Sequence, residues 1–140
     1  MLVIYPRSPR EMMDGWVYLP RFIDKIRLHL AGKLATDYQD NFLKKGFDAL
    51  WLQTAGVDGE KFVEVVRASV TDGEVFDWVR KNVKKTEAEK ALLRETILNR
   101  GRDSEESKAR LKVRKSESGI THRDDITCFV DFIDADEGRL

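Results

Sequence analysis

The stretch from Leu19 to Leu34 constrains the fold most, because its apolar residues recur at three- and four-residue intervals. This stripe consists of Leu19, Ile23, Ile26, Leu30 and Leu34. Side chains at that spacing share one face of an α-helix, so the stretch predicts an amphipathic helix. Pro20 suits a first helical turn, where its missing N–H has no partner to lose. We therefore expect a helix that begins near Pro20 and ends near Gly32.

The segment before this helix has the residue order of a helix start. Ser8 is expected to cap the free N–H groups, Pro9 to occupy the first helical position, and Glu11 to bond back to the cap. Gly15 would then end the helix, since glycine readily adopts the conformation found after a helix end. The sequence therefore predicts a first short helix between Ser8 and Gly15.

Further helical stripes follow a polar loop predicted over residues 35–41. Capping residues are expected at Asp58, Thr71 and Thr86, and helix ends at Gly56 and Gly101. The sequence thus predicts an all-α fold, with residues 1–140 forming a single compact domain of six to seven short helices around one core. The side chains expected to be buried together are Ile23, Ile26, Leu30, Phe62, Trp78 and Val79.

The C-terminal third is harder to interpret. Residues 102–120 are strongly charged, which is typical of a solvated helix or a mobile connection. The last element is expected to begin near Thr121, because Thr121 and Asp124 have the spacing of a capping box. This pair and the helical pattern before it favour a helix. Residues 126–130 also have high strand propensity, so a strand over residues 125–134 stays open as the alternative.

Charge and cysteine content limit the classes of function. The chain has 25 basic and 25 acidic side chains, and this zero formal net charge argues against a broad nucleic-acid surface. Cys128 is the only cysteine, which predicts a reducing compartment such as the cytoplasm. No apolar run approaches 18 residues, and the apolar start is too short for a signal peptide, so we expect no membrane segment.

Charged residues in and before the helix over 19–34 form the best candidate site. Arg27 falls inside the apolar face, where a guanidinium needs a carboxylate, carbonyl oxygens or a bound anion. Asp24 lies one turn back and is within reach. The candidate ligand-binding residues are Arg7, Arg10, Arg21, Asp24, Lys25 and Arg27. The planar guanidinium of Arg7, Arg21 or Arg27 suits a small anionic ligand that carries a carboxylate or phosphate.

A structural role for the same residues is the alternative, and the pattern favours it. The basic side chains would then pair with Asp24 and with the acidic tail formed by Asp131, Asp134, Asp136 and Glu137. Such pairs would tie the two ends of the chain together. The expected partner of Arg27 is Asp24 or one of the acids between Asp131 and Glu137.

No other motif carries recognisable chemistry. His29 and His122 are the only histidines and lack the spacing of a helical zinc site, so no metal and no cofactor are predicted. Cys128 has apolar neighbours, which favours an inert thiol over a nucleophile. Phosphate-binding loops and G-x-S-x-G are absent from the sequence. The sequence therefore assigns no enzyme class.

Two blocks resemble a known family. The first runs from Arg7-Ser8-Pro9-Arg10-Glu11 to Leu30-Ala31-Gly32, and the second includes Asp125-Ile126-Thr127 and Asp134-Ala135-Asp136-Glu137-Gly138-Arg139. They resemble a bacterial family of small helical proteins known as domain of unknown function 5069. The resemblance implies a helical fold and no established reaction. Many members have a Cys-Pro-Leu-Asp-like segment where this chain reads Tyr38-Gln39-Asp40-Asn41, so no role of that cysteine is transferred.

Three functions are compatible with these observations. The leading hypothesis is a non-catalytic domain that binds a small anionic ligand or a protein partner, with the N-terminal charges as its site. The second is an enzyme for a small anionic substrate, with Asp24 as general base and Arg27 in a cleft. The third is a weak nucleic-acid binder that uses the N-terminal basic residues.

Overall fold

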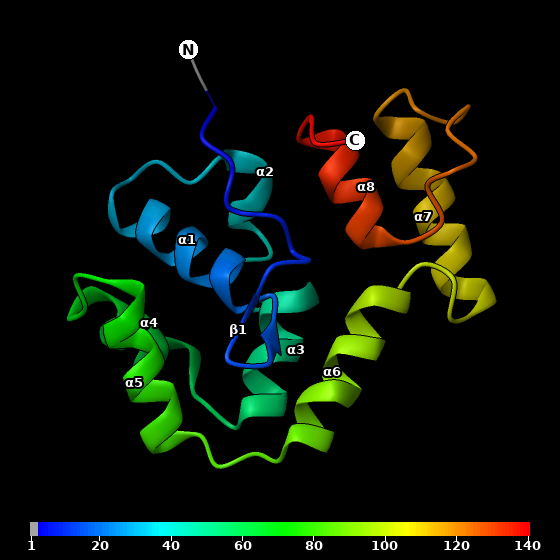
Figure 1. The fold of residues 1–140 in the computed structure, drawn as a ribbon. Helices are drawn as coiled ribbons and strands as arrows, with labels where there is room; N and C mark the ends of the chain where they lie inside the picture. Colours follow the sequence, from blue (N-terminus) through cyan, green and yellow to red (C-terminus); the bar gives the residue numbers. More distant parts are fainter. Residues whose placement is uncertain (1–2) are drawn as a thin grey trace.

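The computed structural model describes residues 3–140 and is helical along most of that length (Figure 1). A two-stranded hairpin, β1 (Met12–Met13) and β2 (Trp16–Val17), precedes the helices. The helices are α1 (Leu19–Leu30), α2 (Thr36–Gln39), α3 (Gly46–Ala55), α4 (Gly59–Arg67), α5 (Asp72–Asn82), α6 (Glu87–Asn99), α7 (Glu105–Glu117) and α8 (Phe129–Asp136). The predicted helical class is confirmed, but the described residues form eight helices instead of six or seven.

The predicted helix between Ser8 and Gly15 is wrong, because this segment forms a turn and the β1–β2 hairpin. Met12 pairs with Val17 across the antiparallel strands. Asp14 and Gly15 connect them with φ angles of 52° and 82°. An Asp-Gly pair with two positive φ angles is the favoured two-residue hairpin connection, and it outweighs the capping pattern.

Helix α1 begins next to Pro20 as predicted and lies against most of the core. Ile23 and Ile26 are fully buried, whereas Leu30 near the helix end is half-buried. The chain enters α1 through Tyr18, whose φ of 74° turns the backbone sharply out of the hairpin. This turn places the tyrosine ring in the core next to Phe22.

Aromatic rings form the centre of the main core. The ring centroids of Trp51 and Phe62 are 5.0 Å apart, and those of Phe22 and Phe62 are 5.4 Å apart. Both spacings lie in the range that favours aromatic pairs. Val79 is buried with them as predicted. Trp78 is only half-buried and packs against the edge of this core.

The predicted helix starts after the hairpin are largely confirmed. The side chains of Asp58, Thr71 and Thr86 each accept a hydrogen bond from the third residue of the helix that follows. The predicted loop over residues 35–41 instead contains the single-turn helix α2. A helix this short is stabilised by its surroundings, because isolated short helices are marginal in water.

The charged segment 102–120 contains helix α7, which is capped by the Ser104 side chain. Leu111 on α7 packs with Ile126 and Phe132 in a second, smaller core. This packing explains why a mostly charged stretch is an ordered helix. Helix α8 begins at Phe129 and not near Thr121, because turns occupy the stretch between α7 and α8. Helix therefore replaces the strand alternative over residues 129–136.

Helix α8 brings the end of the chain back to its beginning. In Figure 1 the C-terminal helix lies beside the N-terminal segment, which passes between it and α1. The Ser8 hydroxyl donates a hydrogen bond of 2.9 Å to Asp134 on α8. The guanidinium of Arg139 bonds the carbonyl oxygen of Pro6. The predicted charged cluster lies at this junction.

Candidate functional site: a charged cluster at the junction of the chain ends

Arg7 connects the N-terminal segment to two helices. Its Nε lies 2.9 Å from the Asp24 carboxylate on α1, and its Nη2 lies 3.0 Å from Asp72, the first residue of α5. Hydrogen bonds from Arg7 raise the pKa of its guanidinium, chiefly the bond to Asp24. The side chain is about two-fifths exposed, so this pair is in contact with water.

Arg27 has a carboxylate partner, as its position required, but the predicted partner is wrong. Its Nη1 lies 2.5 Å from Asp72, whereas Asp24 is bonded through both of its oxygens to Arg7. The sequence spacing pointed to Asp24, and only the packing of α5 near α1 brings Asp72 to Arg27. The second terminal nitrogen of Arg27 is buried without a hydrogen-bond partner.

Arg21 and Glu137 form a buried ion pair between α1 and the C-terminus. The two terminal guanidinium nitrogens donate to the two carboxylate oxygens at 2.9 and 2.7 Å. The side chains are 3% and 1% exposed. Burial alone would raise the pKa of Glu137, but the hydrogen bonds from Arg21 and Tyr38 outweigh it and hold that pKa below its usual value.

Lys25 and Asp48 form a second buried pair, between α1 and α3. The ammonium lies 3.0 Å from each carboxylate oxygen, and the Tyr18 hydroxyl donates to the same carboxylate at 2.6 Å. Burial lowers the pKa of Lys25 despite the attraction of Asp48. Burial, and then the charge of Asp48, raise the pKa of Tyr18 well above its usual value.

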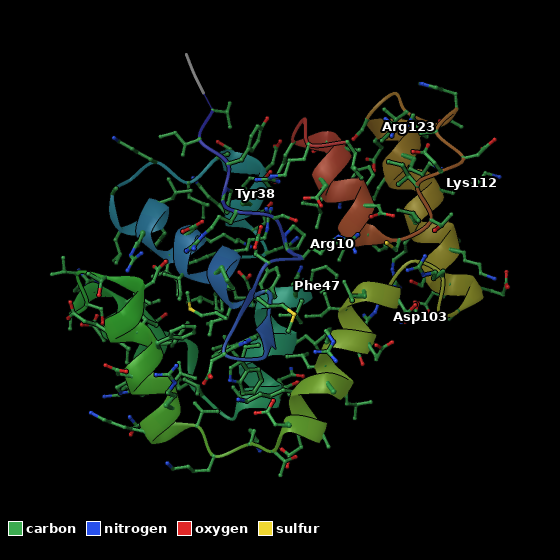
Figure 2. The ribbon with its side chains drawn as sticks, in the orientation of Figure 1. Arg10, Tyr38, Phe47, Asp103, Lys112 and Arg123 are labelled. Carbon is green, nitrogen blue, oxygen red and sulfur yellow. The ribbon has the colours of Figure 1, made fainter. Side chains whose placement is uncertain are left out.

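Tyr38 on α2 covers both buried pairs. Its ring centroid lies 5.6 Å from the Arg21 guanidinium carbon and 5.9 Å from the Lys25 ammonium. Its hydroxyl donates to Glu137 at 2.5 Å. Figure 2 shows Tyr38 on the same side of the molecule as α1. The short helix α2 therefore places an aromatic face over two cations, an arrangement that stabilises them.

Two of the four predicted acids of the tail pair with cations of the candidate site: Asp131 with Arg10 and Glu137 with Arg21. Asp134 instead pairs with Arg139 of the same tail, which also bonds Glu137. Asp136 is exposed and forms no ion pair within residues 3–140. The predicted connection between the chain ends is therefore observed, with Asp136 outside it.

Sequence reasoning missed further members of the cluster, among them Asp48, Asp72, Tyr18 and Tyr38. Asp48 had a usable signal, because an acid within the apolar stripe of a predicted helix needs a buried partner. Tyr18 and Tyr38 had none, since Tyr18 lies between the two predicted helices and Tyr38 lies in a predicted loop.

Two surface pockets lie away from this cluster. The first, which we call the α7 groove, has a volume of about 460 Å³ and lies between α7 and the loop that follows it. It is lined by Gly101, Arg102, Lys108, Leu111, Lys112, Lys115, Thr121, Asp124 and Thr127. The second, of about 370 Å³, lies between the hairpin, the end of α5 and the start of α6. None of the predicted site residues lines either pocket.

The remaining candidate groups have ordinary surroundings. His29 stacks on Phe42 with ring centroids 4.4 Å apart, and Cys128 is a buried free thiol. Within residues 3–140, no three His, Cys, Asp or Glu side chains gather in a way that could hold a metal ion. None of the described helices combines the length and the apolar content needed to cross a membrane.

The fold and the cluster define a small helical domain in which a buried ion pair, Arg21 with Glu137, joins α1 to the C-terminal segment. The chain matches the family described as Domain of unknown function (DUF5069) over residues 3–139. It therefore belongs to this family, as the resemblance of its two sequence blocks implied. A search of curated proteins found no match.

Proposed function

We propose that this protein is a non-catalytic binding domain and that its N-terminal cluster fastens the two ends of the chain together. One observation carries the fastening role. Each cation predicted for the site already has a carboxylate partner in the same chain. The pairs are Arg7 with Asp24, Arg10 with Asp131, Arg21 with Glu137, Lys25 with Asp48, and Arg27 with Asp72. An anionic ligand would have to displace one of these partners, which disfavours binding there.

The same pairs weigh against the two other functions. Asp24 and Arg27 were the candidate residues of an enzyme site, but each is bonded to another side chain. The lowered pKa of Lys25 is the one feature that favours an enzyme, because a neutral lysine can act as a base. Lys25 is only 5% exposed beneath Tyr38, so a substrate would reach it only after α2 moved.

Nucleic-acid binding through the N-terminal residues is disfavoured for the same reason. Phosphate contacts need cations that can exchange counterions for phosphates. In this cluster the counterions are side chains of the same chain, and Arg21 and Lys25 are buried. We also propose a cytoplasmic location, supported by the single cysteine, Cys128, which is a free thiol.

An NMR titration tests the role of the cluster. Inorganic phosphate and a mixture of small carboxylic acids are added to the ¹⁵N-labelled protein, and the backbone amides of residues 6–10 and 20–27 are followed. We expect these amides to remain unchanged at concentrations that perturb other surfaces. Saturable shifts at residues 6–10 and 20–27 would show that the cluster is a ligand site and would overturn the proposal.

A further inference from the structure

The α7 groove differs from the N-terminal cluster in its charge. Its lining contains four cations, Arg102, Lys108, Lys112 and Lys115, against one carboxylate, Asp124. The formal net charge of the whole chain is zero, so this pocket concentrates positive charge that is balanced elsewhere on the molecule. Figure 2 shows Lys112 on the α7 side of the molecule, away from Tyr38 and Arg10.

Arg102 is held in place by neutral oxygen atoms instead of an acid. Its Nε, Nη1 and Nη2 donate to the side-chain oxygen of Asn99, the hydroxyl of Thr127 and the carbonyl of Leu98, at 3.1, 3.0 and 3.1 Å. No ion pair involves Arg102 among the described residues. A guanidinium has five N–H donors, so two remain available on an oriented group that keeps its full charge.

Lys115 is positioned in the same way. Its ammonium donates to the carbonyl oxygens of Arg123 and Ile126 at 2.7 and 3.1 Å, which leaves one of its three donors free. Lys112 lies one turn before Lys115 along the groove, is exposed and forms no ion pair within residues 3–140. Lys108 alone pairs with an acid, Glu105 on its own helix.

The loop wall adds another hydrogen-bond donor. The Thr127 hydroxyl oxygen accepts a hydrogen bond from Arg102, so its own O–H is free to donate another. The groove therefore presents free hydrogen-bond donors on Arg102, Lys112, Lys115 and Thr127. Asp124 is the only acid in the lining that could offset the positive charges of these residues. Arg102, Lys115 and Thr127 are held in place before binding, and donors of this kind suit an anion with several oxygen atoms.

We propose that the α7 groove binds a small molecule that carries phosphate groups, of about the size of a nucleoside diphosphate. Such a ligand has at least two negative charges to match the uncompensated cations. A volume of about 460 Å³ fits a ligand of this size. The inference deepens the binding role proposed above and rests on it. A long nucleic acid fits less well, because it needs a basic surface wider than one pocket.

The experiment is an NMR titration of the ¹⁵N-labelled protein with ADP and with inorganic pyrophosphate, and with adenosine as a control without phosphate. ADP and pyrophosphate should shift the amides of residues 101–102, 111–115 and 121–127 in a saturable way, while adenosine should not. Lys112→Ala should raise the Kd about tenfold, which is the loss expected for one charge-assisted hydrogen bond. This variant removes an exposed side chain and leaves every described hydrogen bond intact.

Two further variants control the assignment. Arg102→Gln should weaken binding at least as much as Lys112→Ala. Because Arg102 also supports the loop, its variant is interpreted only alongside Lys112→Ala. Lys61→Ala removes an exposed lysine on α4 that lines neither pocket, and its Kd should match that of the unmodified protein.

Four results would overturn the proposal. These are the absence of saturable shifts in the groove, equal weakening by Lys61→Ala, equally tight binding of citrate, and tighter binding of a single-stranded DNA oligonucleotide than of ADP. Citrate would show that the groove recognises negative charge and not phosphate, and the oligonucleotide would point to nucleic acid. Shifts at residues 6–10 and 20–27 bear only on the fastening role, so the two proposals fail in distinguishable ways.

Discussion

The buried pair of Arg21 and Glu137 gives the sharpest test of how the chain ends are joined. Replacing Arg21 with Met removes the guanidinium but keeps an unbranched side chain of similar length in the core. Glu137 then remains buried without its bidentate partner. Because both side chains are almost fully buried, the loss falls in the range for breaking a buried pair, about 3–5 kcal/mol of unfolding free energy.

The double variant separates pairing from packing. With Glu137 also replaced by Met, no unpaired charge is buried between α1 and the C-terminus, and Arg139 keeps its bonds to Asp134 and to the Pro6 carbonyl. Replacing a whole buried pair with apolar side chains is often neutral or stabilising. The loss of the Tyr38 hydrogen bond to Glu137 and of the Arg139 ion pair to Glu137 offsets part of this recovery, at about 1 kcal/mol each. The double variant should therefore be more stable than either single variant.

Urea denaturation followed by tryptophan fluorescence measures these differences, since Trp16 and Trp51 are fully buried. Arg67→Met is the matched control, because Arg67 pairs with Glu64 at 3.2 Å but both side chains are mostly exposed. That control should change the unfolding free energy by less than about 0.5 kcal/mol. Additive losses in the double variant, or a loss for Arg21→Met as small as that of the control, would refute the reasoning.

The other predictions use the same assay. Ile26→Ala should cost about 2–5 kcal/mol, because Ile26 is fully buried; a change below 0.5 kcal/mol would be inconsistent with its place in the core. Gly15→Ala should cost about 1–2 kcal/mol, since the φ of 82° is unfavourable for other residues and the added Cβ would lie 3.2 Å from a glutamate oxygen; an unchanged urea midpoint would contradict this. Arg27→Met should cost only about 1 kcal/mol, because its pair with Asp72 is about one-third exposed. A loss equal to that of Arg21→Met would show that the exposure of an ion pair does not predict its contribution to stability in this protein. The unmodified protein should be more stable than Glu137→Gln, and this advantage should be complete above about pH 4.3, the pKa of a glutamate in the unfolded chain. The advantage should shrink as the pH falls through the lowered pKa that Glu137 has in the folded protein. A stability difference that grew as the pH fell would contradict this prediction.

The helices could be predicted where local patterns determine them. The caps at Thr71 and Thr86 and the apolar stripe of α1 depend on residues three or four positions apart, which a sequence displays directly. The hairpin was missed because Ser8 and Glu11 imitate a capping box. Gly15 alone was interpreted as a helix end, although it is the Asp14-Gly15 pair that determines the structure. In that segment two local patterns competed, and the two positive φ angles of the turn decided the outcome.

The partners in the charged cluster could be predicted only in part. The junction of the chain ends was predictable, because an excess of cations near one end and of acids near the other favours pairing. The particular partners were not predictable, since Asp72 reaches Arg27 only through the way α5 packs. A buried partner for Asp48 could have been predicted, because an acid within an apolar stripe needs a cation beside it in the core.

The separation of Arg21 and Glu137 along the chain also has a consequence for protein synthesis. The two residues lie 116 positions apart, and ribosomes add about 5–20 residues per second, so Glu137 emerges roughly 6–23 s after Arg21. During that interval the nascent chain has α1 but lacks the carboxylate that neutralises its buried guanidinium. We therefore expect α1 to remain hydrated and open to chaperones until Glu137 has been synthesised and can pack against it.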